Sequence, residues 1–221
     1  MQKKSDFSIQ MAKCLLHIMG LCITVFGVSL TIKSKLGNNA WDAFSLLISN
    51  LTGVKIGYIA MVMNGSTIVG QILIEREKFE KRQYLQILNV FAAGKIFNFC
   101  VYDLLGDFTV PFLPFKVITI VAGCVIGGLG IAIMVETDFV RNSLEGLCNL
   151  VAIRVSSTLG RIRKCVDAVL IAVILCITVV QKVPWVIGTG TVICMVVYGT
   201  SIDFFRNRIG KLNFYKVLRG I

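Results

Sequence analysis

The chain is short of charge, proline and histidine. Only 16% of its 221 residues are charged and 56% are hydrophobic, whereas soluble domains have about 25% charged and roughly 45–50% apolar residues. Its three prolines and the absence of a polar low-complexity tract argue against a disordered tail or a long linker. This composition is typical of a membrane protein.

Metal and cofactor chemistry has few candidate residues. His17 is the single histidine, and the eight cysteines form no Cys-x-x-Cys pair. Most of these cysteines lie inside apolar runs, where cysteine packs as a small apolar residue. A zinc site needs several such ligands close together, so we expect no metal and no cofactor.

Enzyme signatures are also lacking. The sequence has no Gly-x-Ser-x-Gly nucleophile motif, no phosphate-binding glycine loop ending in Lys-Ser/Thr, and no histidine pair for zinc. We therefore expect that the chain is not an enzyme. Without an ATPase domain, any transport would be secondary or would depend on a partner.

Positive charge is abundant but segregated. The net charge of +11 comes from Lys and Arg residues clustered between apolar runs. A nucleic-acid-binding protein would gather them on one face of a soluble domain, so no nucleic-acid partner is expected. Short cytoplasmic loops of membrane proteins carry such clusters.

Six apolar stretches are long enough, or nearly so, to cross a bilayer core of about 30 Å as helices. They are Cys14–Ile32, Ile56–Ile74, Tyr84–Leu105, Val117–Val135, Cys165–Val180 and Val183–Ile202. The sequence therefore predicts an all-α, polytopic membrane protein with about six transmembrane helices.

The basic residues predict the orientation of these helices. Alternate connections place seventeen Lys and Arg residues on one side and five on the other, with Lys95 inside a helix. The richer side is expected to be cytoplasmic. Both termini are then cytoplasmic, as an even number of spans requires.

The two halves of the chain resemble each other. A shift of 103 residues places Asn39-Ala40-Trp41-Asp42 on Asn142-Ser143-Leu144-Glu145, Ile56-Gly57 on Leu159-Gly160, and Asn64 on Asp167; a shift of 105 places Asn98-Phe99 on Asp203-Phe204. This predicts a first three-span repeat over 1–110 and a second over 111–221 within one membrane domain. An odd number of spans inverts the second repeat, as in many secondary transporters. A pseudo-symmetric bundle without a transport path is the alternative.

Three segments carry a family resemblance. The run from Gly27 to Gly37, the pair Trp41-Asp42 and the run from Leu51 to Gly57 resemble the YczE/YitT-like family of bacterial integral membrane proteins. The resemblance extends over nearly the whole chain. It implies a multi-pass protein of the bacterial plasma membrane, with transport as the usual suggestion for its activity.

A short apolar segment follows the first predicted span of each repeat. Trp41–Leu51 and Leu144–Val155 are too short to cross at about 1.5 Å per residue. Asn39 is a suitable cap for the first, and Asp42 lies in its first turn; Asn142 and Glu145 occupy the matching places in the second. Either both helices lie at the interface, or both re-enter the bundle so that the two carboxylates approach each other.

The re-entrant arrangement makes Asn39, Trp41, Asp42, Asn142 and Glu145 candidates for binding a substrate or ion. Lys95 is the sixth candidate, because a lysine near the middle of a span usually faces the interior and pairs, here with Asp42 or Glu145. The alternative is a lysine whose stem lies along its own helix so that the ammonium reaches water.

Small residues in the fourth predicted span suggest close helix packing. Gly123-x-x-x-Gly127 matches the motif that lets transmembrane helices approach closely. The motif predicts either packing within the bundle or a homodimer face.

Taken together, the sequence predicts a secondary transporter that moves a small solute, with a cation or an amphiphilic cationic molecule favoured by the carboxylates. Its expected partners are the lipid bilayer, the solute and a coupling ion. The alternative is a membrane-embedded accessory or regulatory protein with no transport activity of its own.

Overall fold

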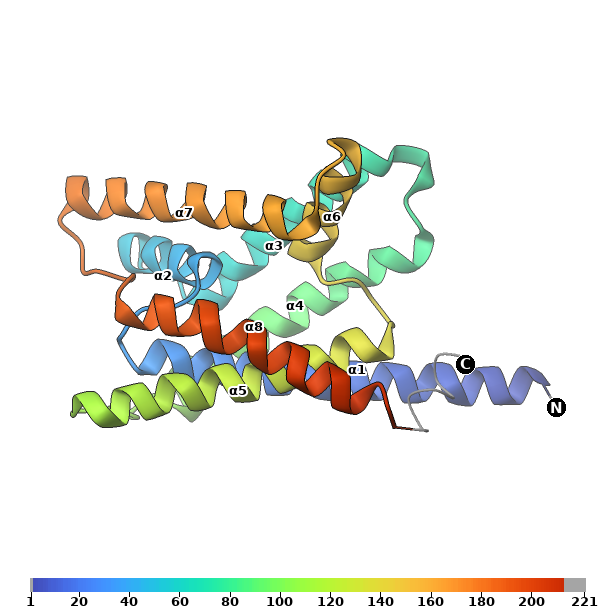
Figure 1. Cartoon of the computed structure of the whole chain (residues 1–221), viewed down its shortest axis with the longest axis horizontal. Coiled ribbons are helices and arrows are strands. Elements are labelled where there is room, and N and C mark those ends of the chain that lie inside the picture. The colour runs from blue at the N-terminus through green and yellow to red at the C-terminus, as the bar shows by residue number, and fades with distance from the viewer. Residues whose placement is uncertain (1, 213–221) are drawn as a thin grey trace.

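The computed structural model describes residues 2–212, and within that range it contains helices and no strands. Figure 1 shows most of the long helices lying roughly along one axis. The α-helices are α1 (Gln2–Lys33), α2 (Ala40–Thr52), α3 (Ile56–Glu75), α4 (Leu85–Asn98), α5 (Leu113–Thr137), α6 (Ser143–Arg154), α7 (Leu159–Gln181) and α8 (Thr189–Ile209). Shorter turns η1 (Arg76–Lys78) and η2 (Lys81–Tyr84) precede α4, and the π-helix η3 (Phe99–Leu104) follows it.

Five helical stretches of the described residues are long and apolar enough to cross a membrane. They are Ile9–Lys33, Ile56–Lys78, Lys81–Leu104, Leu113–Thr137 and Leu159–Gln181. Each contains or overlaps one of the first five predicted spans. The sixth predicted span overlaps α8, which is a helix but is not among these five.

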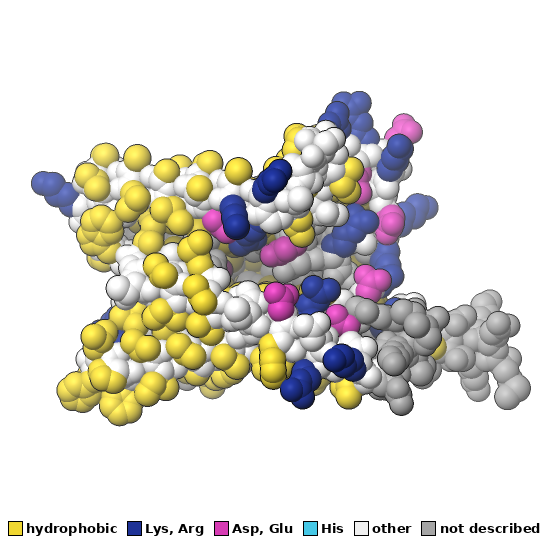
Figure 2. Space-filling view, in the orientation of Figure 1, with side chains coloured by type: hydrophobic (Ala, Val, Ile, Leu, Met, Phe, Trp, Pro, Cys, Tyr) yellow, Lys and Arg dark blue, Asp and Glu magenta, His cyan; other side chains and the backbone are white. Residues whose placement is uncertain are grey.

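The surface separates charged from apolar residues along the long axis of the molecule. Figure 2 shows Lys, Arg, Asp and Glu side chains gathered toward one end and apolar side chains over the other. The α5–α6 and α6–α7 connections lie toward the charged end, and the α7–α8 connection lies at the apolar end (Figure 1). The chain is thus a multi-pass membrane protein whose ends differ strongly in charge.

Helices α1 and α5 pack against each other along a seam of small residues. A Cβ atom at Gly27 would collide with the backbone of Gly123 and Gly127, and one at Gly130 would collide with Gly20 and Thr24. Only glycine permits this approach. Gly123 and Gly127 are therefore buried within the chain; a homodimer through the same glycines would require α1 and α8 to move aside.

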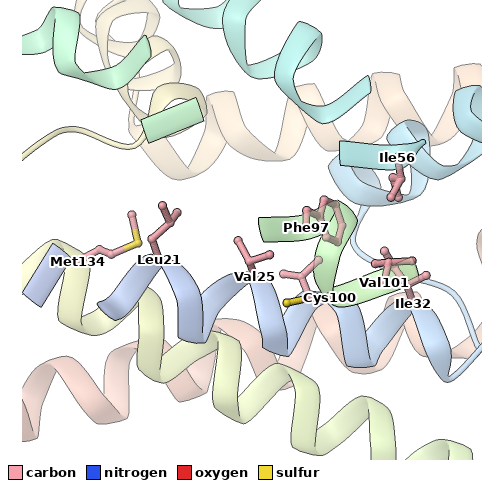
Figure 3. Close-up of a cluster of buried hydrophobic side chains, with 9 residues drawn as sticks. Leu21, Val25, Ile32, Ile56, Phe97, Cys100, Val101 and Met134 are labelled. Atoms are coloured by element: carbon pink, nitrogen blue, oxygen red, sulfur yellow. The ribbon is translucent and has the colours of Figure 1, made fainter. Parts of the chain in front are cut away.

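Apolar side chains fill the space between α1 and the helices α3, α4 and α5. Figure 3 shows Leu21, Val25 and Ile32 of α1 facing residues of α3, α4, η3 and α5. The facing residues are Ile56, Phe97, Cys100, Val101 and Met134. This cluster joins α1 to both halves, because Met134 belongs to the second half.

Each of the two short helices buries one face in this bundle. α2 packs against α3 and α7, and α6 also packs against α3 and α7. Residues Ala43 and Leu47 of α2 are fully buried, and Cys148 and Ala152 of α6 are nearly so. Each short helix thus contacts a long helix from the other half of the chain.

Candidate functional site

A cavity of about 180 Å³ lies at the centre of the molecule. Its apolar residues come mainly from α1, α4 and α5. Its polar residues come from the first turns of α2 and α6 and also from α1, α3, α4, α7 and α8. The polar residues that line it are Thr24, Asn39, Trp41, Asp42, Asn64, Asn89, Asn142, Ser143, Glu145, Arg163 and Tyr198. Five of the six sequence-predicted binding residues are therefore brought to one cavity.

The start of α2 has the cap that the sequence predicts. The Asn39 side-chain oxygen accepts a hydrogen bond from the backbone N–H of Asp42 at 3.1 Å, and the Asn39 amide donates to the Asp42 carboxylate. Asparagine caps helices by satisfying N–H groups that lack an intrahelical partner. This pair of bonds fixes the Asp42 carboxylate beside the cavity.

The start of α6 is held by other helices. Asn142 occupies the cap position but makes no capping side-chain bond. Instead, the Ser143 hydroxyl donates to Asn64 Oδ1 at 2.9 Å, and the Ser143 carbonyl accepts from Gln71 Nε2 at 2.7 Å. The buried Gln71 also exchanges hydrogen bonds with Gln86 of α4. α3 and α4 thereby position the first turn of α6 and its Glu145.

Arg163 of α7 is the central basic residue of the site. Its Nη1 lies 3.3 Å from Glu145 Oε1, and its Nε lies 3.3 Å from Asp167 Oδ2. Sequence reasoning misses this role, because Arg163 precedes the predicted fifth span and therefore contributes only to the basic charge of a cytoplasmic connection. Its i, i+4 spacing to Asp167, which lies inside that span, was the available signal.

The carboxylates outnumber the basic groups around this cluster. Asp42, Glu145 and Asp167 face a single guanidinium, so the four groups carry net negative charge when ionised. Asp167 Oδ1 is buried with no hydrogen-bond partner among the described residues. The excess negative charge favours a cationic ligand over an anionic one.

The same charges act on Asp42, which lies outside the five candidate spans. Burial raises the pKa of Asp42 to about 6; the Asn39 hydrogen bond and the Arg163 charge oppose this, and the Glu145 charge adds to it. Asp42 and Glu145 line the same cavity, so the first turns of the two short helices begin on the same side of the bundle interior.

The tryptophan of the predicted site faces the cavity with an unused donor. Trp41 lines the cavity, and its indole N–H is buried without a hydrogen-bond partner among the described residues. Tyr198 of α8 lines the cavity from the opposite half of the chain. Aromatic rings beside carboxylates form a suitable environment for an organic cation.

A second cavity, of about 740 Å³, continues from this site between α5, α6, α7 and α8. Asn39, Asn142, Glu145, Arg163 and Tyr198 line both cavities. At its charged end the second cavity is lined by Asp138, Arg141 and Arg206. Figure 2 shows a hollow in the surface between α7 and α8. The polar site is thus connected to the charged end of the molecule.

Lys95 does not enter either cavity, so the expectation that it pairs with Asp42 or Glu145 is corrected. Its side chain is exposed, and Nζ lies 5.3 Å from the centre of the Tyr58 ring. The opposite side of α4, with Val90, Gly94 and Phe97, lines the cavity. The depth of a residue in a span does not determine the face of the helix on which it lies.

We expect Lys95→Met to leave ligand binding by the cavity unchanged. The substitution removes an exposed cation–π contact, which is worth about 0.5–1 kcal/mol. Thermal unfolding of the purified protein should shift by a few degrees at most, and cation affinity should stay within about twofold of the parent. A large loss of cation affinity in a folded Lys95→Met protein would show that Lys95 contributes to the binding site.

Comparison with known proteins adds the family. The model of a family of unknown function, DUF6198, matches residues 11–207. The chain is 25% identical over 183 residues to the uncharacterized protein YyaS of Bacillus subtilis (strain 168), covering 83% of this chain and 88% of that protein.

A second relative carries the word membrane in its description. The chain is 29% identical over 138 residues to the uncharacterized membrane protein YczE of the same organism, covering 61% of this chain and 60% of that protein. No solved structure matches. Since the family model covers most of the sequence and YczE is the relative whose resemblance was expected, the chain belongs to DUF6198, a YczE-like membrane protein family of unknown function.

Proposed function

We propose that this protein is a secondary transporter that moves a small cationic solute across the bacterial plasma membrane through the central cavity. The observation that carries the proposal is that Asp42 and Glu145, from the first turns of two separate short helices, both line one cavity. Carboxylates inside a membrane bundle are costly, and they usually mark an ion or substrate path.

An inverted repeat supports alternating access. The repeats comprise α1–α4 and α5–α8, with α8 as the sixth span. In the two repeats, α2 corresponds to α6 and α3 corresponds to α7. Helix α2 contacts α3 and α7, and helix α6 makes the corresponding contacts with α7 and α3. Secondary transporters built from inverted repeats bind substrate at the repeat interface, often at the ends of interrupted helices.

The size and lining of the cavity support a small organic cation. A volume of about 180 Å³ exceeds the space of a single water molecule several times. Asp42 and Glu145 would neutralise the charge of the solute, and Trp41 and Tyr198 would contact its apolar part. Asn39 and Asn142 would supply hydrogen bonds that orient it.

The charge distribution supports an inward-open state. With the basic end in the cytoplasm, both termini are cytoplasmic, and the second cavity opens toward that side. A solute would leave Asp42 and Glu145 by passing Arg141 and Arg206.

Uptake by the purified chain in proteoliposomes tests this function. Radiolabelled sodium, guanidinium and tetraethylammonium would be offered under imposed proton or sodium gradients, with empty liposomes as the control. We expect gradient-driven accumulation of one organic cation. An accessory protein would move none of these cations and would co-purify with a membrane partner, and that outcome would replace the proposal.

Cation affinity is expected to fall as the pH is lowered through about 6, since Asp42 has a raised pKa of about 6 and binds cations only when ionised. Protonation of one site of this pKa weakens the apparent affinity about tenfold at about pH 5 relative to neutral pH. The charged and titratable groups that face Asp42 are Glu145, Arg163, Cys194 and Tyr198.

Calorimetric titration with tetraethylammonium at several pH values measures this dependence. In Asp42→Asn, the step near pH 6 should disappear while a weaker, flatter affinity remains. A step that persists unchanged in Asp42→Asn would assign the titration to another group.

A further inference from the structure

The two halves of the chain differ at one matching pair of helices. In the first half, α3 packs closely on α4. The backbone N–H of Gly57 donates to Asn98 Oδ1 at 2.8 Å, and a Cβ atom at Gly57 would collide with the carbonyl oxygen of Gly94. This contact closes the α3 and α4 side of the bundle at its apolar end.

The second half repeats the three residues of this contact. Gly57 corresponds to Gly160 with the shift of 103, while Gly94 and Asn98 correspond to Gly199 and Asp203 with the shift of 105. Gly57 and Gly160 are each the second residue of their helix, α3 and α7. Each half therefore has a glycine at the start of one long helix, α3 or α7. The long helix that follows, α4 or α8, has a second glycine and, four residues later, an amide or a carboxylate.

The matching contact is not made in the second half. A Cβ atom at Gly160 or at Gly199 would meet no atom of a neighbouring segment within 4 Å. The 740 Å³ cavity lies between these helices, and Leu159 and Gly199 are among its lining residues. The repeat-related surfaces are thus closed on one side of the central site and open on the other.

We propose that these two sets of three residues are the two gates of the transporter, which close alternately. In the state described here, Gly57, Gly94 and Asn98 form the closed gate and Gly160, Gly199 and Asp203 form the open one. In the opposite state α7 closes on α8, Asp203 accepts a hydrogen bond from the Gly160 N–H, and α3 separates from α4. The assignment rests on the proposed transport function.

Helix chemistry makes the missing contact favourable. The first four N–H groups of a helix have no partner within it, so the Gly160 N–H needs an acceptor from elsewhere, as Gly57 does. A carboxylate suits the positive end of the α7 dipole. Glycine at both positions leaves room for α7 to approach α8 as closely as α3 approaches α4.

Three variants separate the gates from general packing. Gly199→Leu has space in the state described here but would block closure of α7 on α8. Asn98→Ala removes the hydrogen bond that holds the α3–α4 gate closed. Gly65→Leu is the matched control, because Gly65 of α3 is equally free of neighbours and belongs to neither gate.

Spin labels at Leu159→Cys and Asn207→Cys report the distance between α7 and α8. These positions correspond to Ile56 and Tyr102, which are hydrogen-bonded across the closed gate at 3.2 Å. The eight native cysteines are replaced first, the fold is checked by size exclusion and thermal unfolding, and labelled protein is diluted with excess unlabelled protein in nanodiscs.

We expect two distance populations in the parent. Asn98→Ala should raise the ratio of the short to the long population by roughly three- to tenfold, as the loss of one hydrogen bond predicts. Gly199→Leu should remove the short population, and Gly65→Leu should leave the ratio unchanged. A short population that is absent in both the parent and Asn98→Ala, or that persists in Gly199→Leu, would overturn the gate assignment.

The outcome is separable from that of the transport assay. If the α7–α8 distance switches as expected but the chain moves none of the offered cations, the gate assignment is supported and the proposed transport function is rejected. If the chain transports a cation while α7 and α8 remain apart, the transport function is supported and the gate assignment is rejected.

Discussion

Replacing Asp42 by Asn together with Glu145 by Gln is expected to abolish cation uptake while the protein still inserts and folds. The double variant removes both carboxylates of the central cavity and keeps the shape of each side chain. Loss of a carboxylate that pairs with a bound ligand costs about 2–5 kcal/mol when the pair is desolvated, and the Glu145 side chain, which is 46% exposed, contributes at the low end of this range. Affinity for tetraethylammonium should therefore fall on the order of a hundredfold or more.

The fold should survive this double substitution for two reasons. The Asn39 oxygen still caps α2 through the backbone N–H of residue 42. Arg163 keeps Asp167 as an ionic partner after Glu145 is neutralised. Size exclusion and thermal unfolding of the purified variant would verify both points before uptake is compared.

An exposed carboxylate gives the matched control. Asp103→Asn removes one carboxylate charge from a residue that lines neither cavity, so uptake should remain at the level of the parent. If the Asp42 and Glu145 double variant transports as well as Asp103→Asn, the carboxylate pair is not the binding site.

The first turns of the short helices could be predicted from sequence because their signals are local. An Asn followed three residues later by an acid marks a helix start within a few residues. The repeat then links Asn39 and Asp42 to Asn142 and Glu145. This symmetry leaves two arrangements open, helices at the interface and helices that bring the two acids together, and the structure places both acids at one cavity.

The basic residues of the site could not be assigned in the same way. Counting Lys and Arg for orientation treats Arg163 as one loop charge among many, although in the structure it pairs with Glu145 and Asp167. The depth of Lys95 in its span favours an interior position over one whose ammonium reaches water, and the structure has it on the exposed face of α4. Which face of a helix meets the cavity depends on packing between helices distant in sequence.

The opening between α7 and α8 was also beyond the sequence. Gly160 and Gly199 repeat the residue type of Gly57 and Gly94 at a spacing that is two residues longer, so the pattern alone does not distinguish the packing of the two halves. The structure closes one pair and opens the other. The difference in packing between the two pairs depends on contacts between helices and is visible only in the structure.

Arg163→Met is expected to destabilise the empty protein and to increase its affinity for a cation. Without the guanidinium, Glu145 and Asp167 lose their ionic partner and repel each other, at a cost of roughly 1–3 kcal/mol for partly exposed groups. The same change removes the internal cation that competes with the substrate. Thermal unfolding should begin at a lower temperature, and tetraethylammonium should raise that temperature more than in the parent, because a ligand stabilises in proportion to RT ln(1 + [L]/Kd).

A double-mutant cycle separates this competition from a merely structural ion pair. Adding Glu145→Gln to Arg163→Met should recover part of the lost stability, since one unpaired carboxylate disappears, and should cancel the gain in affinity. Arg163→Lys should fall between the parent and Arg163→Met, because lysine keeps the charge but cannot reach both carboxylates with a planar fork. If Arg163→Met loses stability without any gain in cation affinity, Arg163 only holds α6 against α7 and does not occupy the site in place of the substrate.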